Sequence, residues 1–265
     1  MGRRLSLSDV SSKGNSLPNR YVLHGLEGWG KTSFGAQLPK PIFIQSRGET
    51  GLETLINNGR LPEVPHFPEA LTWPELLSAV RALVDQPHEH KTLVVDTANG
   101  AERLCCEHVC ATQFKGDWSN FNAYGRGYEN AVAEWIGFLA DLDKARGVRK
   151  MIVLLLCHTQ VRKTKNPEGL DYGRFSPDMN EKMWGATHKW ADVVLFGNFQ
   201  TIVDKQGKAA GGENRILCCS RTAAYDAKNR VGLPDVLDMG GSPQEAWRAF
   251  AAALVAGKQT KEEGK

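Results

Sequence analysis

The chain has 265 residues, 41% of them hydrophobic, so it is long enough to bury one full core. Its 33 lysines and arginines face 30 acids, and the net charge of +3 neither indicates nor excludes a nucleic-acid partner. The longest apolar run, residues 151–157, is far shorter than the roughly 20 residues that span a bilayer. We therefore expect a soluble protein with no membrane partner.

Both ends of the chain are polar. Residues 1–18 are rich in Ser, Arg, Asn and Gly, and residues 257–265 are polar again, which is typical of flexible tails. The six cysteines are clustered, unlike the spaced framework of a disulfide-bonded secreted protein. We expect one domain over residues 19–256 between two flexible tails, in a cytoplasm that keeps its thiols reduced.

Short apolar or β-branched runs alternate with longer helical patterns along the domain. Because the runs are apolar throughout, they indicate strands buried on both faces of a mostly parallel sheet. The predicted strands cover residues 21–24, 41–45, 92–96, 151–157 and 191–196. This alternation predicts an α/β fold with a central sheet flanked by helices.

Two further elements are predicted from spacing. Between the third and fourth strands, apolar residues at helical spacing predict one long amphipathic helix whose core face carries Val132, Trp135, Ile136, Leu139 and Leu142. After the fifth strand, "FQTIV", a Gly/Lys/Asn-rich stretch at 204–214 and "RILCCSR" predict a C-terminal β-hairpin.

A glycine-rich turn follows the first predicted strand. The stretch "GLEGWGKT" fits G-x-x-x-x-G-K-[ST] in full, after a strand and before a helical pattern, as this motif requires. Glycines let the backbone curl around a pyrophosphate so that its N–H groups point at the anion. The sequence therefore predicts an ATP-binding phosphate loop formed by Gly25, Leu26, Glu27, Gly28, Trp29, Gly30, Lys31, Thr32 and Ser33.

Three residues complete a phosphate loop of this kind. Lys31 is the candidate catalytic cation at the β- and γ-phosphates, and the Thr32 hydroxyl is a candidate ligand of Mg2+. Asp96 ends the third predicted strand at the same edge of the sheet, so it is the candidate carboxylate for that Mg2+. A helix cap is the alternative role for such a strand-ending aspartate.

Hydrolysis also needs a group that orients or deprotonates water. Glu49 is the acid nearest to the end of the second predicted strand, and a surface-turn residue is the equal alternative. After the fourth strand, Gln160 is the candidate sensor of the γ-phosphate, with His158 as the second choice. An ordinary strand-end histidine is the alternative for His158.

The succession of these segments resembles a known family. Across roughly residues 19–235, "LHGLEGWGKTSF", "PIFIQ", "KTLVVDT", "AYGRGYENAVAEW", "LLLCHTQ", "KWADVVLFGNF" and "AYDAKNRVGLPD" are similar to segments of the phage-encoded RecA-like nucleotide-binding proteins. The resemblance implies a RecA-like P-loop NTPase core with the phosphate-loop strand central. It also implies ATP-dependent single-stranded DNA binding and annealing, in phage or prophage recombination in a bacterial host cytoplasm.

One position departs from this family. Its members tend to carry an acid two residues after the glutamine of "IQ", where this chain has Arg47, and Glu49 comes two residues later. We therefore expect slow turnover.

The segment "DAKNR" places Lys228 and Arg230 two residues apart, so both project to one side of an extended chain. The resemblance implies that they act as trans-acting fingers on the γ-phosphate held by a neighbouring subunit, in a homo-oligomeric ring or filament. Arg47 is the only arginine near either motif that could replace them. A solvated basic turn is the alternative.

A DNA-facing loop is implied in the long connection at residues 161–185, where cations interleaved with aromatics suit phosphate contacts and base stacking. The candidates are Arg162, Lys163, Lys165, Tyr172, Arg174 and Phe175. Nearby acids offset this charge, and a flexible surface loop is the alternative. Two functions therefore stay open: an ATPase acting on single-stranded DNA, and a nucleotide-dependent switch, related to clock-type RecA-like ATPases, that binds a protein partner and no DNA.

Overall fold

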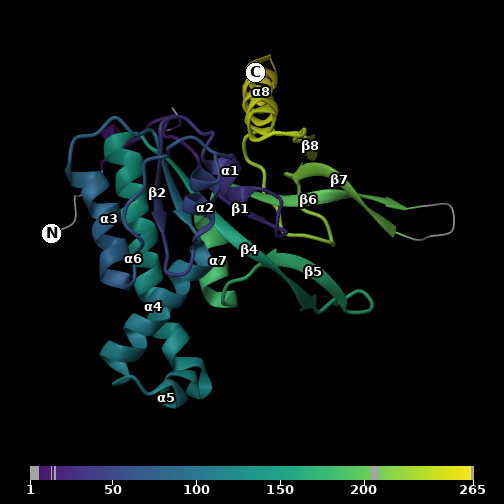
Figure 1. Cartoon of the computed structure of the whole chain (residues 1–265). Coiled ribbons are helices and arrows are strands. Elements are labelled where there is room, and N and C mark those ends of the chain that lie inside the picture. The colour runs from purple at the N-terminus through teal and green to yellow at the C-terminus, as the bar shows by residue number, and fades with distance from the viewer. Residues whose placement is uncertain (1–5, 13, 15, 204–208, 264–265) are drawn as a thin grey trace.

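The computed structural model describes residues 6–12, 14, 16–203 and 209–263. Among these residues, eight strands form one sheet in the order β2-β3-β4-β1-β6-β7-β8, and β5 pairs with β4 outside this path (Figure 1). The strands are β1 (Arg20–Gly25), β2 (Pro41–Gln45), β3 (Thr92–Asp96), β4 (Ile152–Thr164), β5 (Tyr172–Pro177), β6 (Val193–Val203), β7 (Ala209–Cys218) and β8 (Val236–Asp238).

The helices precede, connect or follow these strands. They are η1 (Leu7–Asp9), α1 (Lys31–Gly35), α2 (Gly51–Asn57), α3 (Trp73–Asp85), α4 (Ala98–Gln113), α5 (Trp118–Asn122), η2 (Ala123–Gly125), α6 (Arg126–Arg149), α7 (Glu181–Trp190) and α8 (Pro243–Glu263).

All five predicted strands are confirmed. The pairs β1–β4, β1–β6, β2–β3 and β3–β4 are parallel, and β1 lies between β4 and β6, at the centre of the order β2-β3-β4-β1-β6-β7-β8. The remaining pairs, β4–β5, β6–β7 and β7–β8, are antiparallel, so the predicted C-terminal hairpin is also present. The carboxyl ends of the parallel strands therefore meet at one edge, where the phosphate-loop motif begins.

Helices cover both faces of the sheet. One buried cluster packs side chains of α3, α4, α6 and α7 against one face, which includes Val22, Ile44 and Val95. A second cluster packs α1, α2 and α8 against the other face, which includes Leu23, Phe43 and Val94. Successive strand residues alternate between these clusters, which explains why the strands are apolar throughout.

The predicted amphipathic helix is α6. Its buried residues include Trp135, Leu139 and Leu142, as expected. Ile136, however, is 52% exposed, so the prediction that it belongs to the core was wrong. The helix buries a narrower stripe than its apolar residues suggest.

Two hairpin arms extend on the same side of the molecule, away from α3, α4 and α6 (Figure 1). Strand β4 pairs with β1 as far as His158 and with β5 from Thr159 onward. The segment expected to be one long connection at 161–185 is instead mostly a hairpin followed by α7. The second arm is formed by β6 and β7.

The C-terminal segment also differs from expectation. Helix α8 continues to Glu263, so most of the predicted tail at 257–265 is helical. Phe250 of α8 packs edge-on against Phe34 of α1, with ring centroids 5.4 Å apart. All six cysteines are free and buried. Within the described ranges, no helix is long and apolar enough to cross a membrane.

Candidate active site

The turn between β1 and α1 has the geometry of a phosphate loop. Gly28 and Gly30 have φ angles of +72° and +99°, in the left-handed region that glycine adopts without strain. Gly30 is also the N-cap of α1. The glycines of the motif are therefore required by this backbone path.

Trp29 anchors the loop to the antiparallel part of the sheet. Its side chain is 2% exposed, and its indole Nε1 donates a hydrogen bond to the Ile216 carbonyl of β7 at 3.0 Å. The ring also covers Gly197 of β6, where an added Cβ would lie 2.6 Å from Trp29 Cδ2. The loop is thus held in place by packing against β6 and β7.

The predicted cation, hydroxyl and carboxylate meet at the base of the loop. Lys31 Nζ donates hydrogen bonds to the carbonyls of Gly25 at 2.9 Å and Leu26 at 3.3 Å, and burial lowers the pKa of this lysine. Thr32 Oγ1 donates to Asp96 Oδ2 at 2.9 Å. Burial raises the pKa of the Asp96 carboxyl to about 6.

These residues fit Mg2+. The Thr32 hydroxyl and the Asp96 carboxylate place two oxygen ligands side by side, and Asp96 is only 4% exposed. Mg2+ prefers oxygen ligands and is commonly held by one or two carboxylates together with phosphates and water. A divalent cation here would also compensate a buried carboxylate. No group of three or more His, Cys, Asp or Glu residues suited to a metal occurs in the described part of the chain.

Glu49 forms an acid–base pair with His158. Its Oε1 accepts a hydrogen bond from Thr97 Oγ1 at 2.9 Å and lies 3.4 Å from His158 Nε2. The hydrogen bond with His158 lowers the pKa of Glu49, and the same contact raises the pKa of His158. The Gln45 amide donates to the Glu49 carbonyl at 2.8 Å. Glu49 is therefore held beside the loop rather than free at a surface turn.

Gln160 and Arg47 lie elsewhere. Gln160 is inside β4, where its amide contacts the Pro177 carbonyl at 3.5 Å. Arg47 pairs with Glu107 at 2.5 Å. Of the two candidate sensors, the structure places the second choice, His158, beside the phosphate loop.

A cavity of about 540 Å³ is lined by these groups and by further residues that the sequence did not indicate. Its motif residues include Lys31, Thr32, Glu49, Asp96 and His158. The additional lining comes from α2, the turn after it, β7 and the start of α8, and comprises Leu55, Arg60, Arg215, Met239, Gly241, Ser242, Pro243 and Ala246. No motif or spacing marks these residues, because they meet only in the folded chain.

Two of these residues correct a sequence-based argument. The absence of a suitable arginine near the motifs suggested that a neighbouring subunit supplies one. The structure places Arg60 and Arg215 in the cavity of the same chain.

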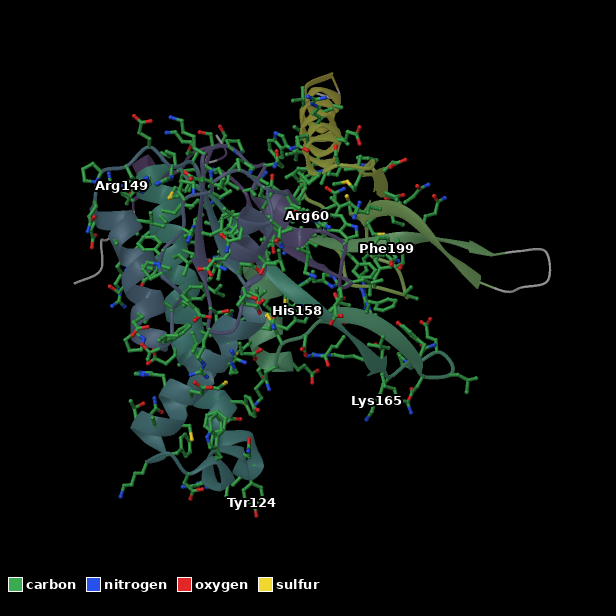
Figure 2. All side chains as sticks on the ribbon, viewed as in Figure 1. Arg60, Tyr124, Arg149, His158, Lys165 and Phe199 are labelled. Carbon is green, nitrogen blue, oxygen red and sulfur yellow. The ribbon has the colours of Figure 1, made fainter. Side chains whose placement is uncertain are left out.

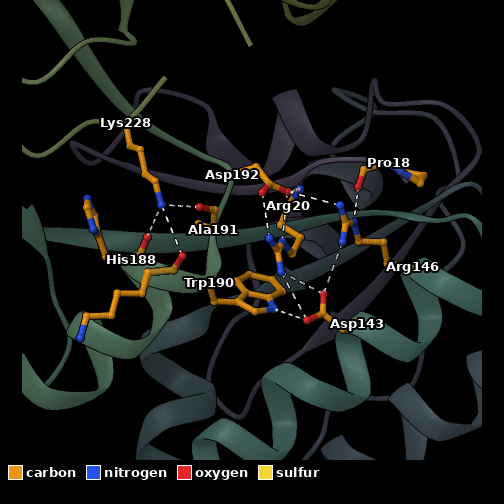
Figure 3. A network of polar contacts seen from close by, with 10 residues as sticks. Pro18, Arg20, Asp143, Arg146, His188, Trp190, Ala191, Asp192 and Lys228 are labelled. Atoms are coloured by element: carbon orange, nitrogen blue, oxygen red, sulfur yellow. Dashed lines mark hydrogen bonds and ion pairs between the residues drawn. The ribbon is translucent and has the colours of Figure 1, made fainter. Parts of the chain in front are cut away.

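Lys228 has a different environment from the one expected. Its Nζ donates hydrogen bonds to the carbonyls of His188 at 2.7 Å and Ala191 at 2.6 Å, at the end of α7 (Figure 3). In this conformation the ammonium is bound within its own chain, and its expected role as a finger on a neighbouring subunit stays a prediction. Arg230 is exposed two residues further along, and its action on a neighbour stays a prediction.

Figure 3 also shows the network that fixes the other end of β1. Arg20 pairs with Asp192 at 2.8 Å and with Asp143 at 3.3 Å, which joins β1 to α6 and to the start of β6. The phosphate loop therefore follows a strand whose first residue, Arg20, is held by ion pairs to α6 and to the start of β6.

The candidate DNA-contacting residues differ in exposure. Arg174 is 7% exposed and pairs with Asp226 at 2.8 Å, so it is a buried structural residue and not a surface contact. Phe175 is half-buried and stacks on Phe196, with ring centroids 5.2 Å apart. Lys163 and Lys165 are exposed on the β4–β5 arm, with Arg162 and Tyr172 half-buried beside them.

The fold and the loop define a RecA-like P-loop NTPase: a mostly parallel sheet, a central loop strand, and a complete phosphate loop facing an aspartate at the end of β3. The chain belongs to the AAA domain family, which matches residues 17–231.

Solved structures agree with this fold. The RadB recombinase matches with a TM-score of 0.50 and 11% identity, over 86% of this chain and 90% of that chain. At this identity the likeness concerns the fold alone. No curated protein matches the sequence.

Proposed function

We propose that this protein binds ATP with Mg2+, hydrolyses it, and acts on single-stranded DNA in phage or prophage recombination by annealing or pairing strands. The observation that carries the ATPase part is the meeting of Lys31, the Thr32–Asp96 pair and the Glu49–His158 pair in one cavity. Each part supplies one requirement of phosphoryl transfer to water.

The roles follow from charge and position. On nucleotide binding, the Lys31 ammonium exchanges its contacts with loop carbonyls for contacts with the β- and γ-phosphates. Thr32 and Asp96 would hold Mg2+, which would supply positive charge to neutralise the phosphates. A carboxylate such as Glu49 is ionised near neutral pH, and its contact with His158 lowers its pKa further, so it is available to accept the proton of an attacking water. His158, which pairs with Glu49 in the same cavity, would contact the γ-phosphate and report its loss through Glu49.

Hydrolysis is tested with Glu49→Gln, which keeps the size of the side chain and removes its basicity. We expect nucleotide affinity within about threefold of wild type and a hydrolysis rate reduced at least about a hundredfold. Undiminished hydrolysis by this variant would exclude Glu49 as the base.

The DNA part of the proposal is supported by the β4–β5 arm. Lys163 and Lys165 are exposed on a projecting hairpin, and the aromatic ring of Tyr172 lies on the opposite strand. Figure 2 shows Lys165 near the tip of this arm and His158 at its root. Cations beside an aromatic ring suit single-stranded nucleic acid, and β4 connects them directly to the ATP site. The fold shared with RadB, a recombinase, is consistent with this role.

The test is binding of a fluorescein-labelled oligonucleotide at several salt concentrations, with and without ATP. Wild-type affinity should fall as salt rises, and Lys163→Ala/Lys165→Ala should bind more weakly and with a shallower salt dependence. Lys91→Ala is the matched control, because Lys91 is exposed at the opposite end of the sheet. Retained ATP binding without any oligonucleotide binding would instead favour the switch that binds a protein partner.

Assembly into a ring or filament is also part of the proposal, with Arg230 reaching the site of a neighbour. Mixing Arg230→Ala with Lys31→Ala protein creates interfaces that have one intact loop and one intact arginine. Recovery of hydrolysis in the mixture is the expected result. No recovery at any ratio would contradict a role in trans.

A further inference from the structure

We infer that the cavity contains a separate subsite for the nucleoside, formed by Arg60, Arg215 and the chain leading into α8. This inference rests on the proposed nucleotide binding and adds the part of the protein that recognises the base. It makes the C-terminal helix part of the nucleotide site within a single chain.

The first observation is the shape of the lining. One end of the cavity is formed by the phosphate loop with Lys31 and Thr32, and the lining continues to the first residues of α8. Its volume of about 540 Å³ falls in the range of roughly 300–1,000 Å³ that is usual for small-molecule sites. The cavity therefore has room for more than the phosphates.

The second observation concerns the start of α8, where a side chain of the same chain already binds two backbone N–H groups. The Glu245 carboxylate accepts hydrogen bonds from the backbone N–H groups of Gly241 at 2.8 Å and Ser242 at 3.1 Å. The side chains that this segment adds to the lining include Pro243 and Ala246. Because the Glu245 carboxylate already occupies these N–H groups, they are not available to bind a phosphate. The apolar side chains of Pro243 and Ala246 make this wall suited to an uncharged group.

The third observation is a donor without a partner. Arg215 Nε is buried at the cavity lining and has no hydrogen-bond partner among the described residues. The Arg215 carbonyl accepts a hydrogen bond from the Met239 backbone N–H at 3.0 Å, which keeps β7 and the segment before α8 together. A buried donor of this kind is stabilised when a ligand supplies an acceptor. Ring nitrogens, carbonyls and ribose hydroxyls of a nucleoside are such acceptors.

The fourth observation is Arg60, which lines the cavity and is exposed. Its guanidinium makes no hydrogen bond or ion pair with the residues that the structure describes. A guanidinium stacks on planar aromatic groups and contributes to binding when it does so. With the half-buried Leu55 beside it, Arg60 supplies a planar cation and an apolar contact for an aromatic base.

The inference is tested by comparing ATP with inorganic tripolyphosphate, which carries the phosphates without the nucleoside. Binding is measured by calorimetry with Mg2+ for wild type, Arg60→Ala and Arg215→Gln. Wild type should bind ATP at least about tenfold more tightly than tripolyphosphate. Each variant should lose about five- to tenfold in ATP affinity and less than about twofold in tripolyphosphate affinity. Arg126→Ala, a matched exposed arginine on the α6 side, should match wild type for both ligands.

The possible results distinguish failure of the nucleoside subsite from failure of nucleotide binding itself. Equal wild-type affinity for the two ligands, or an equal loss of both in the variants, would overturn the nucleoside subsite and leave the phosphate site intact. If wild type binds neither ligand, the proposed nucleotide binding fails, and the subsite fails with it. Arg60 is exposed, so Arg60→Ala tests the subsite even if Arg215→Gln does not fold.

Discussion

Replacement of Lys228 by alanine is predicted to destabilise the fold by about 2 kcal/mol. The ammonium lies 2.7 Å from the His188 carbonyl and 2.6 Å from the Ala191 carbonyl, with the Lys189 carbonyl at 3.5 Å. The last carbonyls of a helix have no partner within the helix, and a cation there also complements the helix dipole. A hydrogen bond to a charged group contributes about 1.5–3 kcal/mol when buried. Lys228 is only half-buried and one ammonium makes all three contacts, so we expect the total effect of a single such bond, about 2 kcal/mol.

The assay is urea unfolding followed by circular dichroism, with Lys189→Ala as the matched control. Lys189 is exposed on the same helix, so its replacement should change the free energy of unfolding by less than about 0.5 kcal/mol. The dependence of that free energy on urea should be the same in all three proteins, because the same surface is exposed on unfolding.

A Lys228→Ala protein as stable as wild type would refute this reasoning. If that protein also bound ATP normally, hydrolysed it poorly and recovered activity on mixing with Lys31→Ala protein, Lys228 would act on a neighbouring subunit after all. Loss of stability with normal hydrolysis in the remaining folded protein is the result that the intrachain contacts predict.

Three further predictions concern individual groups. Lys31→Ala should weaken ATP binding or hydrolysis at least about tenfold without changing the circular dichroism spectrum, because the phosphate charge loses its cation; full turnover would contradict this. Asp96→Asn should reduce Mg2+-dependent hydrolysis more than ATP binding measured without Mg2+, and an equal loss of both would argue against a metal role. Burial raises the pKa of Glu102 from 4.5 to about 7, so the folded state binds this proton more tightly than the unfolded chain does. The associated stability is complete below pH 4.5 and is lost as the pH rises towards 7, by up to about 3 kcal/mol. Glu102→Gln keeps the acceptor for the Asn180 backbone N–H, which lies 2.7 Å from Glu102 Oε1, and should remove this pH dependence from urea unfolding curves; an unchanged slope would show that another group is responsible.

Local features were predictable from the sequence alone. The phosphate loop requires particular residues at adjacent positions, so its glycines and Lys31 were found without tertiary information. Strands buried on both faces are apolar throughout, so β1, β2 and β3 were located to within one residue. Asp96 was found because the carboxyl ends of parallel strands share one edge of the sheet.

The environments of residues whose partners are far away in the sequence could not be predicted from residue type and spacing. Residue type and spacing do not distinguish Arg174, buried against Asp226, from the exposed Lys163 nearby. Likewise, nothing in "DAKNR" shows that Lys228 reaches the end of α7. Burial and ion pairing depend on which elements pack together, and that is decided by the whole core.

The complete cavity shows most clearly which part of the site the sequence determined and which part depends on the tertiary structure. Its phosphate end is formed within a few residues of one turn, so the sequence determined it. Its other wall joins Arg60, Arg215 and Ala246, which are far apart in the chain and belong to no common motif. Only the packing of α1, α2 and α8 on one face of the sheet brings these side chains together, because a contact between distant segments follows from tertiary structure and not from local spacing.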